Sequence, residues 1–353
     1  MRANDASASR VLVFRTGHLG DTVCAIPAFR LIRQNFPQAE LTLLCDRPAD
    51  GKVATADVIG RLGLFDRIVT YESGKGVRTA LELRRCVQEA RPDLVALLPG
   101  VRETSEGVRQ KKAFLRLCGV RNVWARRFPE TRAGWQPNEP RRLIEMLHGF
   151  GMSGEKPPYG IPIDEQARAA VERRLATVGV DARRPFLIFC GGGKAATQCW
   201  SLERYAGVLR PVSETLAWPV VGLGGPRELF AYRALVLPKV PRLHLLPEAF
   251  SLAEVFEILR MAAAYLGNDT GPMHAAASVE CPVAVVMSAR NAPGTWDPDV
   301  EPRLIVRHRT DCEDCFLQEC TEQQHRCMMD ISVERVIAEL MPFLHSLKNR
   351  GNI

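Results

Sequence analysis

The sequence lacks an apolar run long enough to cross a membrane, because a spanning helix needs ~18–20 consecutive apolar residues and none of the 353 residues begins such a run. Near the start, only four apolar residues follow one another, Val11 to Phe14, which is too short for a signal-peptide core. The composition, 46% hydrophobic and 25% charged, excludes a disordered, a collagen-like and a small disulfide-stapled chain. We therefore expect a cytoplasmic protein of two domains, with contact at a membrane surface left open.

Outside one segment, the chain has no excess charge of either sign. The net charge is +7, and residues 102–142 hold eleven Lys or Arg against four Glu. Such a segment attracts phosphate, nucleic acid or acidic lipid, or else forms a solvated face with internal ion pairs. Trp124 and Trp135 lie inside it and favour a contact surface.

Two common phosphate-binding fingerprints are missing. The turn after the first expected strand is not a G-x-G-x-x-G motif, which argues against a dinucleotide-dependent oxidoreductase. The glycine turn 191–194 lacks the spacing and the G-K-[ST] ending of a P-loop. Any phosphate binding must therefore rely on neither of these two motifs.

Short apolar runs alternate with helical patterns in both halves of the chain. The runs that predict strands cover residues 11–14, 41–45, 68–71, 94–98, 186–190, 220–223, 243–246, 264–266 and 283–287. Between them, apolar residues recur at helical spacing, as over residues 23–36. This repetition predicts an α/β fold of two doubly wound parallel sheets, each Rossmann-like, that face a cleft.

A segment rich in Pro and Gly, between residues 128 and 162, predicts the linker. We expect a first domain over residues 1–160 and a second over residues 161–331. A terminal segment, 332–353, contains an amphipathic helix pattern.

The first segment that can carry chemistry is Arg15 to Thr22, directly after the first expected strand. Its two glycines, Gly17 and Gly20, allow a tight turn, and Asp21 opens the next helix. The helix dipole stabilises an acidic residue there, which explains Asp21 without any function. The same dipole would keep a carboxylate ionised at the edge of the sheet, where it could accept a proton.

Two turns in the second half are suited to phosphate. The glycines 191–193 let backbone N–H groups approach phosphate oxygens, and Lys194 could add a charge. In the stretch from Asn268 to His274, a strand end runs through a polar turn into a helix of small residues. Free N–H groups at that helix start suit a diphosphate, with Thr270 and His274 as further donors.

The eleven cysteines fall into two groups. Seven are scattered in or beside apolar segments and are expected to be small buried hydrophobes in a reducing compartment. The other four, Cys312, Cys315, Cys320 and Cys327, lie within sixteen residues and could close a structural zinc or iron site. Free thiols remain the alternative for this cluster.

Taken together, these segments resemble glycosyltransferase family 9, the bacterial heptosyltransferases of the lipopolysaccharide inner core. The resemblance covers about residues 11–347. It rests on the Leu19-Gly20-Asp21 turn with Ile26-Pro27-Ala28, on the stretch from Asn268 to His274, and on residues 224–228. The cysteine-rich tail with Phe316 and His325 resembles that of heptosyltransferase II members.

The resemblance implies a GT-B fold in which the first domain takes the acceptor, the second takes a nucleotide sugar, usually ADP-heptose, and the last helix packs back on the first domain. It implies Asp21 as general base and Glu228 as the ribose ligand. Gly20 would also contact substrate. The remaining nucleotide-binding residues would be Gly193, Lys194, Gln198, Asp269, Thr270, Gly271 and His274. Many members carry Lys at the position of Gln198, so here Lys194 would supply that charge.

The function implied is inverting transfer of heptose from ADP-heptose to a core sugar hydroxyl, with no metal or other cofactor for catalysis. The implied partners are this donor and an anionic glycan or glycolipid acceptor, with peripheral contact at the inner membrane and no nucleic acid. One alternative is an O-heptosyltransferase acting on autotransporter proteins, with a cysteine-bound iron. Another is a nucleotide-sugar-binding protein without catalysis. The oligomeric state stays open.

Overall fold

Parallel sheets form the framework of both halves of the chain. The computed structural model describes residues 8–47, 55–125, 137–246, 248–321 and 323–349. Its contacts divide the chain into two units, Met1–Pro162 and Ile163–Ile353. The expected division at residue 160 lies close to this one.

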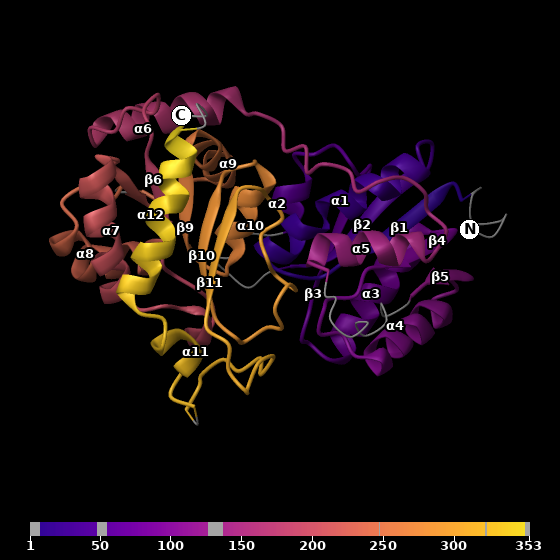
Figure 1. The fold of residues 1–353 in the computed structure, drawn as a ribbon. Helices are drawn as coiled ribbons and strands as arrows, with labels where there is room; N and C mark the ends of the chain where they lie inside the picture. Colours follow the sequence, from indigo (N-terminus) through magenta and orange to yellow (C-terminus); the bar gives the residue numbers. More distant parts are fainter. Residues whose placement is uncertain (1–7, 48–54, 126–136, 247, 322, 350–353) are drawn as a thin grey trace. The chain divides into compact units, whose positions relative to one another are not determined.

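In the first unit, strands alternate with helices, as Figure 1 shows. In chain order the elements are β1 (Arg10–Phe14), α1 (Leu19–Asn35), β2 (Glu40–Arg47), α2 (Thr55–Ile59), β3 (Arg67–Glu72), α3 (Val77–Ala90), β4 (Leu94–Leu97), α4 (Ser105–Leu117), β5 (Asn122–Trp124) and α5 (Glu139–His148). The strands are parallel, in the order β3-β2-β1-β4-β5. Because β1 lies at the centre, the chain reverses direction across the sheet there, which is where ligands bind in such folds.

Both faces of this sheet are covered. Phe14 and Leu97 point to the face on which α3 and α4 pack, through residues such as Val87 and Leu115. Helices α1 and α5 lie against each other and cover the opposite face (Figure 1). Because these strands are buried on both faces, their sequences are continuous apolar runs, and those runs predicted their positions.

The second unit repeats this design with a larger sheet. Its elements are α6 (Glu165–Thr177), β6 (Leu187–Cys190), η1 (Ala196–Gln198), α7 (Leu202–Leu216), β7 (Val220–Gly222), α8 (Pro226–Leu235), η2 (Leu237–Lys239), β8 (Leu243–His244), α9 (Leu252–Met261), β9 (Ala264–Asn268), α10 (Gly271–Ser278), β10 (Val283–Met287), β11 (Arg303–Arg307), α11 (Arg326–Met329) and α12 (Val333–Asn349). The strand order is β11-β10-β9-β6-β7-β8, and all paired strands are parallel.

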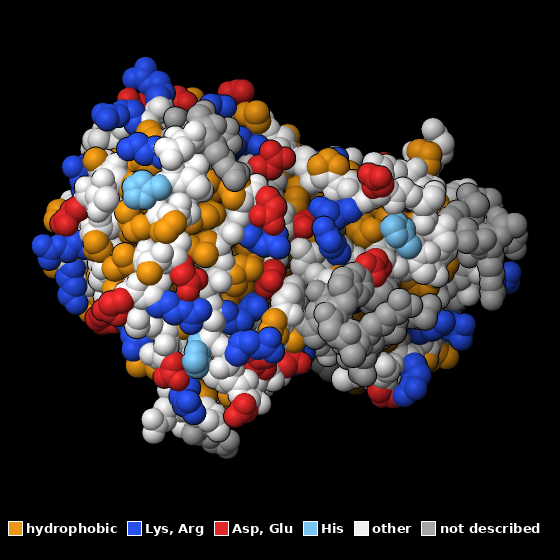
Figure 2. All heavy atoms as spheres, in the orientation of Figure 1, with side chains coloured by type: hydrophobic (Ala, Val, Ile, Leu, Met, Phe, Trp, Pro, Cys, Tyr) orange, Lys and Arg blue, Asp and Glu red, His pale blue; other side chains and the backbone are white. Residues whose placement is uncertain are grey.

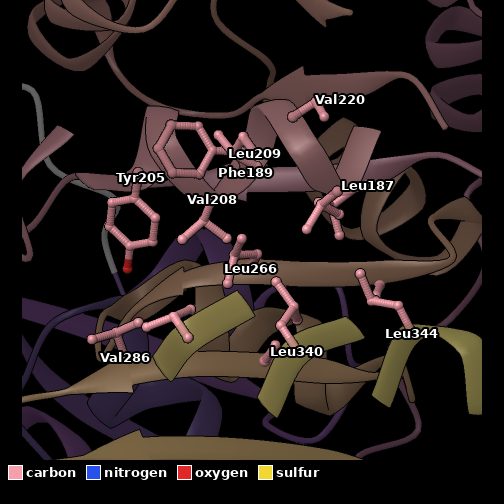
Figure 3. Close-up of a cluster of buried hydrophobic side chains, with 14 of the residues drawn as sticks. Leu187, Phe189, Tyr205, Val208, Leu209, Val220, Leu266, Val286, Leu340 and Leu344 are labelled. Atoms are coloured by element: carbon pink, nitrogen blue, oxygen red, sulfur yellow. The ribbon is translucent and has the colours of Figure 1, made fainter. Parts of the chain in front are cut away.

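The C-terminal helix differs from its expected position. Instead of being assigned to the first domain, α12 belongs to the second unit, where Leu340 and Leu344 are fully buried with Leu187 and Leu266 of the sheet (Figure 3). Its neighbours there are α7 and β11. The amphipathic pattern identified the helix and its buried face, but a pattern within one segment does not say which sheet that face will cover.

The sequence did not predict several of the elements, among them α4, β5 and β11. Helix α4 lies inside the basic segment, where charged residues outnumber apolar ones, and only Val108 and Leu115 of it are buried. Strand β5 has three residues, and β11 places a charged residue at each end. Among the described residues, the helices all fall short of the length and apolarity that a membrane-spanning helix requires.

Candidate active site

The carboxyl end of β1 carries the first part of the site. Asp21 lies in the first turn of α1, and its side chain is 30% exposed. Its Oδ2 accepts a hydrogen bond from the backbone N–H of His18 at 3.0 Å. Gly17 is required beside it, because a Cβ on Gly17 would lie 2.4 Å from the Cβ of Asp21. The turn therefore fixes one carboxylate oxygen and leaves the group open to solvent.

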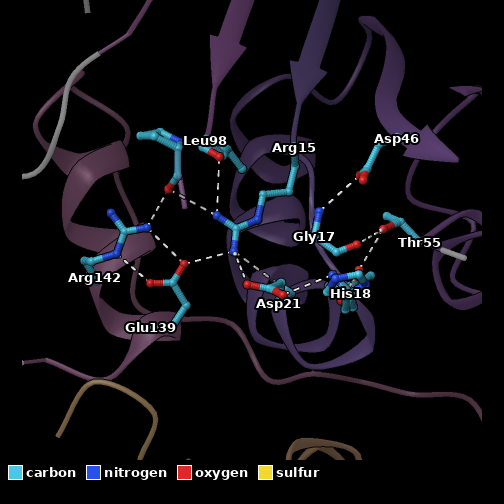
Figure 4. A network of polar contacts seen from close by, with 11 residues as sticks. Arg15, Gly17, His18, Asp21, Asp46, Thr55, Leu98, Glu139 and Arg142 are labelled. Carbon is cyan, nitrogen blue, oxygen red and sulfur yellow. Dashed lines mark hydrogen bonds and ion pairs between the residues drawn. The ribbon is translucent and has the colours of Figure 1, made fainter. Parts of the chain in front are cut away.

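The side chain of Arg15, which is buried, contacts this turn. Arg15 is 1% exposed and donates to the carbonyl oxygens of Leu98 and Pro99, at the end of β4, and to that of Asp21 (Figure 4). Its Nη2 lies 2.9 Å from Oε1 of Glu139 and 3.9 Å from Oδ1 of Asp21. Arg15 thus joins the ends of two strands to the helix that carries Asp21.

Glu139 is the counter-charge of this arginine. It is fully buried at the start of α5 and also accepts two hydrogen bonds from Arg142. Burial alone raises the pKa of Glu139, but the guanidinium groups of Arg142 and Arg15 outweigh it and hold the pKa below its ordinary value. Glu139 is therefore ionised at neutral pH and keeps the buried charge of Arg15 balanced.

The second unit brings the expected nucleotide residues together at the carboxyl ends of its strands. The turn after β6 packs against Glu228 of α8, because a Cβ on Gly192 would lie 2.5 Å from the Cγ of Glu228. A Cβ on Gly193 would lie 3.3 Å from the Cγ2 of Thr270. Only glycines allow the backbone to pass so close to both residues.

Asn268 holds these turns together, and the sequence reading assigned it no role. Its side chain is fully buried at the end of β9 and donates from Nδ2 to the carbonyl oxygens of Gly191 and Gly192 at 2.7 and 3.2 Å. Its Oδ1 accepts from the N–H of Trp200 and the hydroxyl of Tyr205. A buried amide that satisfies four bonds fixes the glycine turn relative to β9.

Gln198 and Lys194 take different positions. The Gln198 amide donates to the backbone oxygen of Asp269 at 3.0 Å, so it ties the loop after β6 to the loop after β9. Lys194 is exposed on the glycine turn. Tyr232, which the sequence reading missed, places its hydroxyl 2.9 and 3.1 Å from the N–H groups of Gly191 and Gly192.

Asp269, which precedes α10, and His274, which lies within α10, both have buried side chains. Their side chains approach to 3.9 Å between Oδ1 and Nε2. Burial raises the pKa of Asp269 to about 7, against the opposing effects of Arg307, Asn291 and Arg290. Thr270 is the N-cap residue of α10, which begins at Gly271. The first N–H groups of α10 therefore point out of the same edge as these side chains.

The cysteine-rich tail holds the loop after β6 in place. The backbone oxygen of Leu317 accepts a hydrogen bond from the hydroxyl of Thr197 at 2.6 Å, and that of Gln318 accepts one from the N–H of Thr197 at 3.3 Å. A ring nitrogen of His325 lies 2.9 Å from the oxygen of Thr197. The tail thus positions the loop that carries Gln198.

The predicted structural metal is not supported. Burial raises the pKa of the Cys327 thiol, and the nearby thiols of Cys312, Cys315 and Cys320 raise it further. Within the described part of the chain, however, no three His, Cys, Asp or Glu side chains are arranged to hold a metal ion. All eleven cysteines are free, and five of the seven scattered ones are buried, as expected.

Comparison with known proteins places this arrangement in a family. The sequence model of glycosyltransferase family 9 (heptosyltransferase) matches residues 136–326. The chain belongs to glycosyltransferase family 9. It is also 23% identical, over 97% of its length and 99% of the relative's, to a Haemophilus influenzae protein named as a glycosyltransferase. The chain is therefore a glycosyltransferase, and the resemblance drawn from the sequence is confirmed.

Solved structures of this family share the fold. A family 9 glycosyltransferase from Veillonella parvula superposes with a TM-score of 0.73 at 18% identity, over 96% of this chain and 98% of that one. Heptosyltransferase II from E. coli gives 0.66 at 17% identity, over 96% and 99%. The iron-containing heptosyltransferase TibC from enterotoxigenic E. coli, in complex with ADP-D-beta-D-heptose, gives 0.58 at 12% identity, over 96% and 77%. The predicted class, two doubly wound parallel-sheet domains of GT-B type, is confirmed.

We predict that Glu139→Gln destabilises the enzyme by about 3 kcal/mol, because breaking a buried ion pair leaves two guanidinium groups without a counter-charge. Chemical denaturation at pH 7 measures this. Glu106→Gln, which removes an exposed partner of Arg109 on α4, is the matched control and is expected to change stability little. Equal losses in both variants would contradict a special role for Glu139.

We predict that the contribution of Asp269 to the stability of the enzyme declines between pH 4 and pH 7. Its pKa rises from 3.8 in the unfolded chain to about 7 in the folded one, so the folded state binds more protons in this window. The contribution is complete below about pH 4 and lost as pH rises through about 7. Asp269→Asn should remove this decline and be more stable than wild type at pH 8. Parallel stability curves for the two proteins across this range would contradict the prediction.

Proposed function

We propose that this family 9 enzyme transfers heptose from ADP-heptose to a sugar hydroxyl of the lipopolysaccharide core, with inversion, in the cytoplasm. The observation that carries the proposal is the pairing of two features in one family member. The first unit presents a half-exposed carboxylate, Asp21, in the turn after its central strand. The second presents a buried polar turn at a helix start, suited to a diphosphate.

Asp21 would act as the general base. The acceptor hydroxyl oxygen attacks the anomeric carbon, the bond from that carbon to the diphosphate breaks, and the hydroxyl proton passes to Asp21. One displacement of this kind inverts the anomeric centre. The His18 N–H binds Oδ2 and Arg15 Nη2 lies 3.9 Å from Oδ1, so both contacts hold the carboxylate in place, and each oxygen keeps a lone pair that can accept the proton. Arg15 holds the backbone of Asp21 in place through its carbonyl oxygen.

The start of α10 would bind the leaving diphosphate. Its N–H groups, the Thr270 hydroxyl and the His274 ring can donate to phosphate oxygens, and the helix dipole favours the negative charge that ADP carries away. The Thr270 hydroxyl donates to the backbone oxygen of Asn268 across a long distance of 3.4 Å. A stronger acceptor such as phosphate would draw it away.

Glu228 and the glycine turn would take the nucleoside. Glu228 is half-buried at the first turn of α8, against Gly192 and Gly224. A carboxylate accepts hydrogen bonds from two neighbouring hydroxyls, which is the arrangement that a ribose offers. Gly193 lets the backbone approach the phosphates, and Lys194 would add a charge at the exposed side of the turn.

The donor is proposed as ADP-heptose because the TibC structure, which shares this fold, holds ADP-D-beta-D-heptose. A second candidate function is transfer of heptose from the same donor to a protein hydroxyl. The two candidates share the donor and the base and differ in the acceptor alone.

We predict that Asp21→Asn lowers kcat by about 10²–10⁴-fold, the usual contribution of a general base, while ADP affinity stays within about twofold of wild type. Transfer assays and calorimetric titration with ADP measure the two quantities. Asp66→Asn is a matched control, because Asp66 is an exposed acidic residue paired with Arg33. Near-normal turnover in Asp21→Asn would remove the proposed base.

A screen of donors and acceptors tests the reaction itself. We expect turnover with ADP-heptose on a lipopolysaccharide core acceptor and at least tenfold less with UDP- or GDP-sugars, about 1.4 kcal/mol of discrimination. An autotransporter peptide is the second acceptor. Turnover on the peptide alone would select the protein heptosyltransferase, and turnover with a different sugar donor alone would overturn the assignment of heptose.

A further inference from the structure

The first unit contains a cavity of about 590 Å³ away from the residues discussed above. It lies where α4 ends, along β5, and at the turn after α5. Lys112, Arg116 and Arg121 line it, together with Trp124, His148 and Phe150. Its size is in the range of pockets that hold small ligands.

The cavity lies toward the end of the sheet opposite to Asp21. Helix α5 begins at Glu139, beside Arg15 at the carboxyl end of β1, and ends at His148 beside the cavity. At 1.5 Å of rise per residue, these two ends of α5 are roughly 13 Å apart. Strand β5 also begins beside the first residue of β4, at the amino end of the sheet. The cavity is therefore separate from the proposed base.

The cations of the basic segment divide into two kinds. Arg109 pairs with Glu106, and Lys111 pairs with Glu103, so these two behave as the solvated face that the sequence allowed. By contrast, Lys112, Arg116 and Arg121 form no ion pair with any described acidic residue. Figure 2 shows Lys and Arg side chains gathered over α4, at the lower right.

The same three cations meet at one cavity, and no Asp or Glu stands among the described residues that line it. Like charges around one hollow repel each other, and Lys112 is half-buried, so water screens it less than a fully exposed lysine. An anion in the cavity would relieve this repulsion. Two guanidinium forks and one ammonium group match the oxygens of a phosphate.

A rigid aromatic wall completes the cavity. The rings of Trp124 and Phe150 stack with centroids 5.3 Å apart and planes within 8°. Phe36, at the end of α1, packs against Trp124 with ring centroids 6.0 Å apart. Leu117, which follows Arg116 at the end of α4, is 84% exposed. Rigid apolar walls beside cations suit a phosphate that carries an organic group.

We propose that this cavity binds the phosphate group of a phosphate ester, at a site distinct from the donor diphosphate. The ester is either a soluble phosphate or the headgroup of an anionic phospholipid, since both offer the same group to Lys112, Arg116 and Arg121. The lipid source is tested separately because Leu117, next to Arg116 in the sequence, is an exposed apolar side chain that could contact a membrane surface.

The experiment uses the full-length enzyme and two probes. Calorimetry measures binding of glycerol 3-phosphate, and cosedimentation measures binding to phosphatidylcholine vesicles with and without phosphatidylglycerol. The test variant is Lys112→Gln with Arg121→Gln. The control is Arg109→Gln with Lys111→Gln, which removes the same charge from paired side chains of α4.

We expect wild type to bind at least one probe and the test variant to bind it at least tenfold more weakly, with the control within about twofold. Binding of glycerol 3-phosphate identifies a soluble ligand site, and binding of phosphatidylglycerol vesicles alone identifies a headgroup site. Failure of wild type to bind either probe overturns the proposal. Equal losses in test and control variants overturn it too, because they would reflect net charge alone. Affinity for ADP, expected to be unchanged in the test variant, separates this result from the proposed transfer reaction.

Discussion

The side-chain amide of Asn268 is the interaction on which the second unit's site depends. It binds the glycine turn after β6 with its nitrogen, and the backbone of Trp200 and the hydroxyl of Tyr205 with its oxygen. Glycine turns have many conformations of similar energy. A fully buried amide with four bonds selects one of them, because any other would leave buried polar groups without partners.

In the first unit, a buried ion pair fixes the turn at the candidate site, where the second unit uses a buried amide. Arg15 joins the ends of β1 and β4 to α1, and its charge is balanced by Glu139 from α5, more than a hundred residues away in the chain. A buried guanidinium is costly unless its counter-ion is fixed and hydrogen-bonded, and Arg142 supplies that fixation. The position of the turn that holds Asp21 therefore depends on the packing of α5 against α1.

The cations of the basic segment fall into two groups, those paired with carboxylates and those that line the cavity. Glu103, Glu106 and Glu139 form ion pairs with cations of the basic segment, namely Lys111, Arg109 and Arg142. The cations at the end of α4 and before β5 have no such partner among the described residues. A net charge read from composition thus combines two populations with different roles, and only their positions separate them.

The sequence by itself determined the parallel-sheet fold and most of the strands, because buried strands leave patterns within short segments. Glycine turns and helix starts in the same segments predicted the turns that hold Asp21 and Asp269 as candidate sites. The tertiary structure alone decided which segments meet. It paired Arg15 with Glu139, placed Glu228 against Gly192, and buried α12 in the second unit. It also left the four clustered thiols without a metal-binding arrangement among the described residues. These outcomes depend on packing between segments distant in the chain, and spacing along the sequence carries no information about the distance between such segments in space.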